Sequence, residues 1–79
     1  MNQLRESALA ADPALQAERA LPALFHRLNN QLGIILACAE LLELKAVDDV
    51  SRTRAGEIVA KVLDAMGTAK EIRHTTDLL

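Results

Sequence analysis

The sequence predicts an all-α protein, an antiparallel two-helix hairpin that homodimerises into a four-helix bundle. Two long stretches carry apolar residues spaced alternately by three and four, and a short polar segment near 45–50 separates them. This spacing places the apolar residues of each stretch on one side of a helix. A short connection makes consecutive helices pack antiparallel. Of the 79 residues 51% are hydrophobic and 1% aromatic, which suits a core of interdigitated aliphatic side chains.

Residues 1–12 are expected to form a flexible or helical N-terminal lead, and residues 13–79 the hairpin domain. Asp12 followed by Pro13 predicts an N-cap with proline at the first helical position, and the helix should continue to about Lys45. Pro22 lacks the N–H that would bond back to Glu18, so it either kinks or restarts this helix. The apolar seam of the first helix is predicted to comprise Leu21, Phe25, Leu28, Leu32, Ile35, Ala39 and Leu42.

The second helix is expected from about Ser51, acting as the cap, to Asp77. Its apolar face spans roughly 200° of arc, more than one hairpin partner covers. A chain this short also buries a small fraction of its surface when alone. A second copy is therefore expected to complete the bundle about a two-fold axis. The predicted dimer and bundle core comprises Leu28, Leu32, Ile35, Ala39, Leu42, Ile58, Val62, Ala69 and Ile72.

Composition argues against several classes of function. The net charge is −2 with acids and bases interspersed, so a nucleic-acid partner is not expected. The longest apolar run, residues 34–39, is too short to span a bilayer, and the N-terminus lacks signal-peptide features. With the single Cys38 read as a reduced thiol, these features predict a cytoplasmic protein. His26, Cys38 and His74 lack metal-ligand spacing, so no cofactor or metal is expected in this chain.

The strongest candidate for chemistry is His26, which lies roughly 150° from the apolar seam and should be exposed. Asn29 and Asn30 follow by three and four residues, and their amides can hydrogen-bond an imidazole, a phosphoryl oxygen or a water. Gly33 follows one turn after Asn30 and costs about 1 kcal/mol relative to Ala in a helix. It leaves bare backbone where another molecule can approach closely.

The side of the first helix that carries His26 is also apolar. A helix that is apolar nearly all round either lies in a core or offers a docking surface. A docking surface is favoured in so small a chain, and a wider bundle interior is the alternative. The predicted docking residues are Gly33, Ile34, Ala37, Leu41 and Leu44.

Residues 26–32 read His-Arg-Leu-Asn-Asn-Gln-Leu, and residues 33–42 continue Gly-Ile-Ile-Leu-Ala-Cys-Ala-Glu-Leu-Leu. This segment resembles the dimerisation and histidine-phosphotransfer domain of sensor histidine kinases, the HisKA-like domain also found in stand-alone histidine phosphotransfer proteins. The resemblance covers about residues 21–79. It implies a homodimeric four-helix bundle in two-component signalling. His26 would be the phospho-acceptor and would exchange a phosphoryl group with an aspartate of a response-regulator receiver domain.

The same resemblance implies that Asn30 positions water during dephosphorylation and that Mg²⁺ belongs to the receiver partner. Three features depart from the family pattern. Arg27 replaces the usual acidic residue after the histidine, Gln31 replaces a common proline, and the chain ends at Leu79 without an ATP-binding segment. No autokinase activity is therefore expected from this chain alone, although a kinase ATP-binding domain acting in trans is a possible partner.

Two functions follow from these features. The favoured one is phosphotransfer through His26, with Arg27 adding positive potential near the phosphoryl group. The alternative is a non-catalytic dimerisation or adaptor bundle derived from a histidine kinase domain. Arg27 favours the alternative, whereas the Asn29–Asn30 pair and Gly33 favour phosphotransfer, because a scaffold gains nothing from a helix-weakening glycine beside a histidine.

Overall fold

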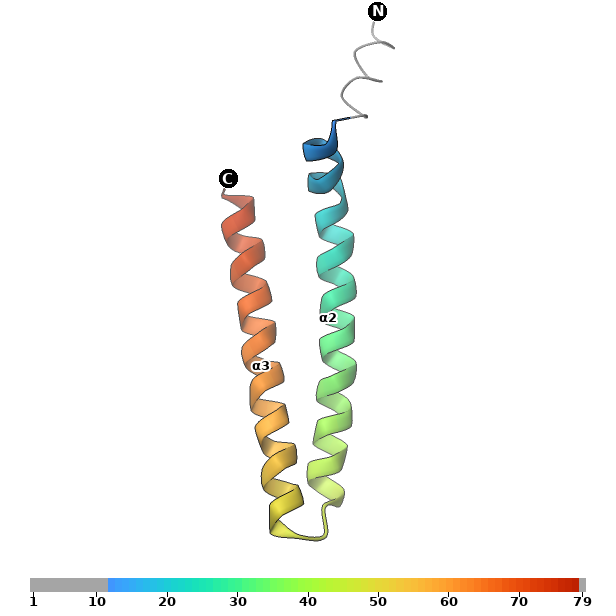
Figure 1. The fold of residues 1–79 in the computed structure, drawn as a ribbon, viewed down its shortest axis with the longest axis vertical. Coiled ribbons are helices and arrows are strands. Elements are labelled where there is room, and N and C mark those ends of the chain that lie inside the picture. The colour runs from blue at the N-terminus through green and yellow to red at the C-terminus, as the bar shows by residue number, and fades with distance from the viewer. Residues whose placement is uncertain (1–11, 79) are drawn as a thin grey trace, which may run out of the picture.

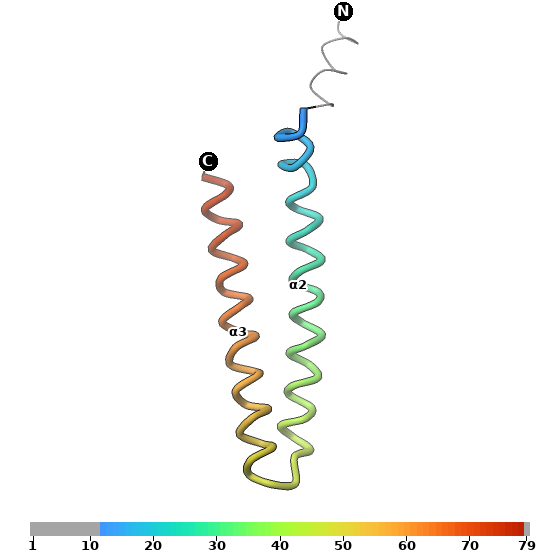
Figure 2. The backbone as a smooth tube through the Cα atoms, in the orientation of Figure 1, coloured from blue at the N-terminus to red at the C-terminus, as the bar shows by residue number. Residues whose placement is uncertain are grey.

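The computed structural model describes residues 12–78, which form two α-helices joined by a short turn (Figure 1). Helix α2 spans Pro13–Lys45 and helix α3 spans Asp49–Asp77. The helices run antiparallel and side by side, so both ends of the described chain lie opposite the turn (Figures 1 and 2). The predicted all-helical hairpin is confirmed, and neither helix is long and apolar enough to cross a membrane. Of the predicted lead, residues 1–11 lie outside the described residues, as does Leu79.

Helix α2 begins and ends where the sequence predicts. Asp12 has an extended backbone, and its Oδ1 accepts a hydrogen bond from the N–H of Ala14 at 2.9 Å. Pro13 occupies the first helical position, where its missing N–H leaves no bond unmade. Pro22 lies inside the helix, which continues through it without interruption. Of the two expectations for Pro22, a restart of the helix is therefore wrong.

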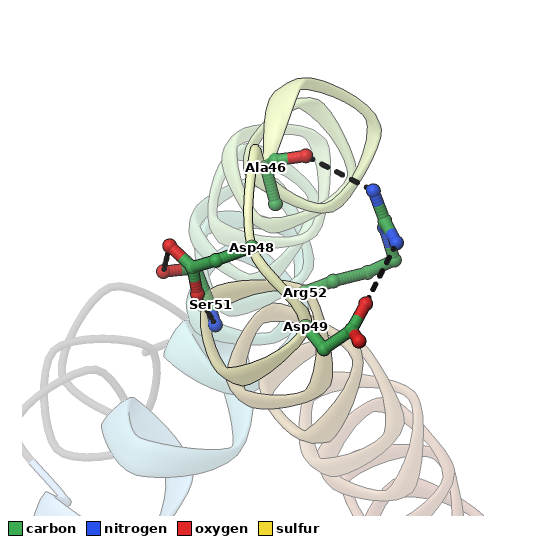
Figure 3. Close-up of polar contacts among 5 residues, drawn as sticks. All are labelled: Ala46, Asp48, Asp49, Ser51 and Arg52. Atoms are coloured by element: carbon green, nitrogen blue, oxygen red, sulfur yellow. Dashed lines mark hydrogen bonds and ion pairs between the residues drawn. The ribbon is translucent and has the colours of Figure 1, made fainter.

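Helix α3 begins at Asp49, earlier than predicted, because its N-cap is Asp48, three residues before the predicted cap Ser51. The Oδ1 atom of Asp48 accepts from the backbone N–H of Ser51 at 2.7 Å, and Oδ2 accepts from the Ser51 hydroxyl at 3.1 Å (Figure 3). Ser51 thus supplies donors to the cap and is not itself the cap. A carboxylate is well suited to this position, since it also interacts favourably with the positive end of the helix dipole.

Arg52 of α3 forms a hydrogen bond to the C-terminal end of α2 across the turn. Its Nη2 atom donates to the carbonyl oxygen of Ala46 at 3.1 Å, and its Nη1 atom lies 3.4 Å from Oδ1 of Asp49 (Figure 3). The hydrogen bond to Ala46 satisfies a carbonyl oxygen at the C-terminal end of α2. Carbonyl groups at this end have no backbone N–H from a following helical turn to accept from. The ion pair with Asp49 is exposed and adds little to stability.

The side chains buried between α2 and α3 are small. The buried residues are Ala39, Ala55, Val62 and Ala69, and no large side chain among the described residues is fully buried. Alanines at the contact allow the two backbones to approach closely. Larger residues at the same contact, such as Phe25 and Leu36, are only partly covered. The interior of one hairpin is therefore thin.

Three of the seven residues of the predicted seam of α2 stay exposed on one face of the hairpin. Leu28, Ile35 and Leu42 follow one another by seven residues and so share a line along the helix. Two adjoining grooves between the helices, one lined by Leu32 and one by Leu42, share Ile58 of α3 and therefore lie on the same face. We call this the open apolar face. Its residues, with their exposed fractions, are Leu28 (38%), Ile35 (47%), Leu42 (61%), Ile58 (43%) and Ile72 (53%).

The cap of α3 makes a pH-dependent prediction. Hydrogen bonds from Ser51, first from its backbone N–H and then from its hydroxyl, lower the pKa of Asp48 below its ordinary value of 3.8. Because the folded-state pKa lies below the unfolded one, the carboxylate stabilises the fold above pH 3.8. That contribution is lost as the pH falls through the folded value. Asp48→Ala should therefore lower the Tm at pH 7, and the difference from wild type should shrink steadily in acid.

Thermal unfolding followed by circular dichroism between pH 2 and pH 7 measures this effect. Asp49→Ala is the matched control, since it removes a neighbouring first-turn carboxylate that forms an exposed ion pair but no capping hydrogen bond. Its Tm should fall less than that of Asp48→Ala. Equal losses in the two variants, or a loss in Asp48→Ala that does not depend on pH, would contradict the assignment of the cap.

Candidate functional site

His26 lies exposed on α2, with one polar neighbour in contact. The Nδ2 atom of Asn30 lies 3.4 Å from Nε2 of His26. Side chains four residues apart share a helix face, and each leans toward the helix N-terminus, so Asn30 reaches back to the imidazole. When this amide donates, Nε2 is the unprotonated nitrogen and the ring proton resides on Nδ1. The length of the bond makes it weak.

Asn29 and Arg27 are also exposed, but the structure does not join them to His26. Neither forms a hydrogen bond or ion pair with another residue in the described part of the chain. Arg27 lies about 100° around the helix from the imidazole, as the next residue of a helix must. Of the three residues predicted to assist His26, only Asn30 contacts it.

The predicted docking residues form an exposed apolar strip along α2. Ile34, Leu41 and Leu44 are 65%, 53% and 81% exposed, and Ala37 is exposed between them. A Cβ atom added to Gly33 would meet nothing within 4 Å. The packing of the hairpin therefore does not require a glycine at this position, although glycine weakens the helix.

His26 and the open apolar face lie on opposite sides of α2. Successive residues rotate by about 100°, which places Ile35 about 180° and Leu28 about 160° from His26. A second molecule that covers the open apolar face therefore leaves the imidazole accessible. The helical repeat of α2 alone therefore places His26 opposite the open apolar face.

Helix α3 contributes to the side of the hairpin that carries Gly33 and His26. The Glu43 carboxylate lies 3.5 Å from the position of a Cβ on Gly56, and Glu40 and Glu43 line a groove with Val59 of α3. Steps of seven residues extend this side along both helices. We call it the histidine face. Its residues are His26, Gly33 and Glu40 on α2 and Gly56, Leu63 and Lys70 on α3.

The sequence alone does not place Lys70 on this face. The repeat of seven residues from Gly56 to Lys70 is visible in the sequence, but it does not show which face of α2 lies beside it. That depends on how the two helices are rotated against each other.

The site offers nucleophilic chemistry without a metal-ligand cluster in the described region. Within residues 12–78, no three side chains of His, Cys, Asp or Glu come together to hold a metal ion. Cys38 is exposed and free, and it lies roughly 120° around α2 from His26. An exposed imidazole with an available ring nitrogen and an adjacent amide can accept an electrophilic group and hydrogen-bond to it.

Comparisons of the chain with models of protein families, with curated proteins and with solved structures gave no match. The resemblance to histidine-phosphotransfer domains is thus carried by the residues of the chain alone, chiefly 26–42. The function of the site is therefore inferred from the residues and their geometry, and it is given below as a proposal.

Proposed function

We propose that this chain is a histidine-phosphotransfer module of two-component signalling, in which His26 exchanges a phosphoryl group with an aspartate of a response-regulator receiver domain. The observation that carries the proposal is the pair formed by His26 and Asn30. The imidazole is exposed, and the Asn30 amide lies 3.4 Å from Nε2, the nitrogen that would react. The apolar strip beside the pair supplies a surface for the partner.

The reaction requires a neutral imidazole. The lone pair of Nε2 attacks the phosphorus of the aspartyl phosphate in line, an N–P bond forms, and the P–O bond to the carboxylate breaks. The aspartate leaves as a carboxylate, and the phosphorylated ring can release the proton from Nδ1 to solvent. Such a transfer depends on positioning and charge neutralisation, and the Mg²⁺ of the receiver supplies part of that neutralisation.

Asn30 has two successive roles in this proposal. Its hydrogen bond to Nε2 at 3.4 Å favours the tautomer whose lone pair reacts, and a bond this long is easily displaced. After transfer, the same amide can donate to a phosphoryl oxygen. The resemblance further implies that it can hold a water for dephosphorylation.

We further propose that two hairpins pair through the open apolar face to form a four-helix bundle. The hairpin buries only small side chains between its helices, while Ile35, Leu42 and Ile58 remain 43–61% exposed. Burying a large aliphatic side chain is worth about 1.5–3 kcal/mol, so pairing these residues with a second copy stabilises both chains. The receiver would then dock on the opposite side, at Gly33, Ile34, Ala37, Leu41 and Leu44.

The phosphotransfer proposal predicts which histidine becomes labelled. Wild-type chain incubated with radiolabelled, phosphorylated receiver domains should acquire an acid-labile phosphoryl group. His26→Gln should abolish the label while changing the free energy of unfolding by no more than about 0.5 kcal/mol, since His26 is exposed. His74→Gln is the matched control and should label like wild type. Label that persists in His26→Gln would contradict His26 as the acceptor, and a wild-type chain that no receiver labels would favour the adaptor bundle.

Two adjacent isoleucines separate pairing from docking. Ile35→Asp places a charge on the open apolar face and should dissociate the dimer, because an unpaired buried charge is strongly unfavourable. Ile34→Asp alters the docking strip, so it should leave the dimer intact and slow transfer from the receiver. Sedimentation velocity at micromolar concentration reports the first effect and the labelling assay the second. A folded wild-type monomer, or dissociation by Ile34→Asp alone, would contradict these assignments.

A further inference from the structure

The structure defines which residues of α2 and α3 stand at the same level. The guanidinium of Arg73 lies over the ring of Phe25, 5.9 Å from its centroid, and near the turn Glu43 lies beside Gly56. Because the helices are antiparallel, a residue one position later in α2 is level with a residue one position earlier in α3. Between these two contacts, Lys70 stands level with Leu28. That level is two residues, or about 3 Å along the axis, from the level of His26.

Lys70 also shares the histidine face with His26. It follows Gly56 by two steps of seven residues, and Gly56 contacts Glu43 on that face. The other lysine of α3, Lys61, lies on the opposite face, where it lines a groove with Leu32 and Ile58. Of the two lysines, only Lys70 is therefore close to the imidazole both along the helix axis and in face. Arg73 stands level with Phe25, but its guanidinium lies over the Phe25 ring.

No acidic residue lies three or four positions from Lys70 on its own helix, and Glu71, the next residue, points about 100° away. The residues three and four positions away are Met66, Gly67, Arg73 and His74, none of them acidic. Lys70 is exposed and forms no ion pair with any residue between 12 and 78. Lys61, in contrast, has Glu57 four residues before it and Asp64 three residues after it, spacings at which opposite charges attract.

We propose that Lys70 is the cation that binds the phosphoryl group carried by His26. The inference rests on the proposed phosphotransfer function and adds a residue from the second helix to the site. A lysine side chain is long and flexible, with a compact ammonium group. It can extend across the histidine face to phosphoryl oxygens that project from Nε2. No bond to Lys70 forms or breaks, because its ammonium acts only by charge and hydrogen bonding.

This arrangement has two consequences for the phosphorylated chain. A cation beside the phosphoryl group favours its doubly charged form, so the group binds a proton less tightly. The same attraction favours phosphohistidine over aspartyl phosphate in exchange with the receiver. For exposed charges about 6 Å apart, an effective dielectric constant between about 40 and 80 gives an effect of about three- to tenfold. It should decline in 1 M salt, where the Debye length is about 3 Å.

The test uses a His74→Gln chain, in which His26 is the remaining histidine, phosphorylated by potassium phosphoramidate, which requires no docked partner. Titration of the phosphoryl group by ³¹P NMR measures its proton affinity directly. Lys70→Gln should raise that affinity about three- to tenfold, Lys70→Arg should preserve the wild-type value, and Lys61→Gln should not change it. A purely structural role for Lys70 would not move this titration, and circular dichroism checks that each variant is folded.

The transfer equilibrium with a receiver provides the second measurement. Lys70→Gln should reduce the ratio of phosphohistidine to aspartyl phosphate by a similar factor, and Lys61→Gln should not. Identical titrations for wild type and Lys70→Gln would overturn the role of Lys70 while leaving phosphotransfer intact. A chain that phosphoramidate labels but no receiver labels would instead overturn the proposed function, and the titration would still decide the role of Lys70.

Discussion

The constraint on which the structure depends is the small size of the side chains between its two helices. Three of the four buried residues are alanines, and the fourth is Val62. They let the helices approach closely, but they remove little apolar surface from water, and that surface is the main source of stability. The larger aliphatic residues lie beside this contact. A hairpin built in this way leaves its largest apolar side chains exposed, and this exposed surface is the basis for the proposed dimer.

The same constraint bears on the proposed site. The open apolar face and His26 lie about 160–180° apart on α2, so the proposed association and the proposed reaction use opposite sides of one helix. In the proposed bundle, the dimer supplies stability and leaves the imidazole, Asn30 and the strip around Gly33 facing solvent. Such a division suits a module that must stay assembled while it admits a partner to its reactive group.

Local sequence signals predicted much of the fold. The helical repeat, the Asp12–Pro13 start and the end of α2 at Lys45 all depend on residues close together in the chain, and the structure has them as predicted. The start of α3 was wrong because Asp48 and Ser51 are both good N-cap residues. Only the three-dimensional arrangement shows the Ser51 N–H and hydroxyl donating to Asp48.

The sequence predicts the residues of the candidate site that lie on α2. It does not predict which residues of α3 lie near them. His26, Asn30 and Gly33 share a line along α2 through spacing alone, and the contact between His26 and Asn30 agrees with that spacing. Lys70 belongs to the other helix, and its level on the histidine face follows from contacts between the helices, such as Phe25 with Arg73. The seam of α2 shows the same limit, since periodicity identifies an apolar side but not which half of it a neighbouring helix covers.

The four isoleucines of the chain permit one direct test of the account. In a single hairpin Ile34, Ile35, Ile58 and Ile72 are all 43–65% exposed. Isoleucine-methyl NMR of the wild-type chain with a soluble paramagnetic agent reports the solvent exposure of each one. If two hairpins pair through the open apolar face, the methyl groups of Ile35, Ile58 and Ile72 are protected and that of Ile34 is strongly broadened. Comparable broadening of all four, or protection of Ile34 alone, would contradict the account.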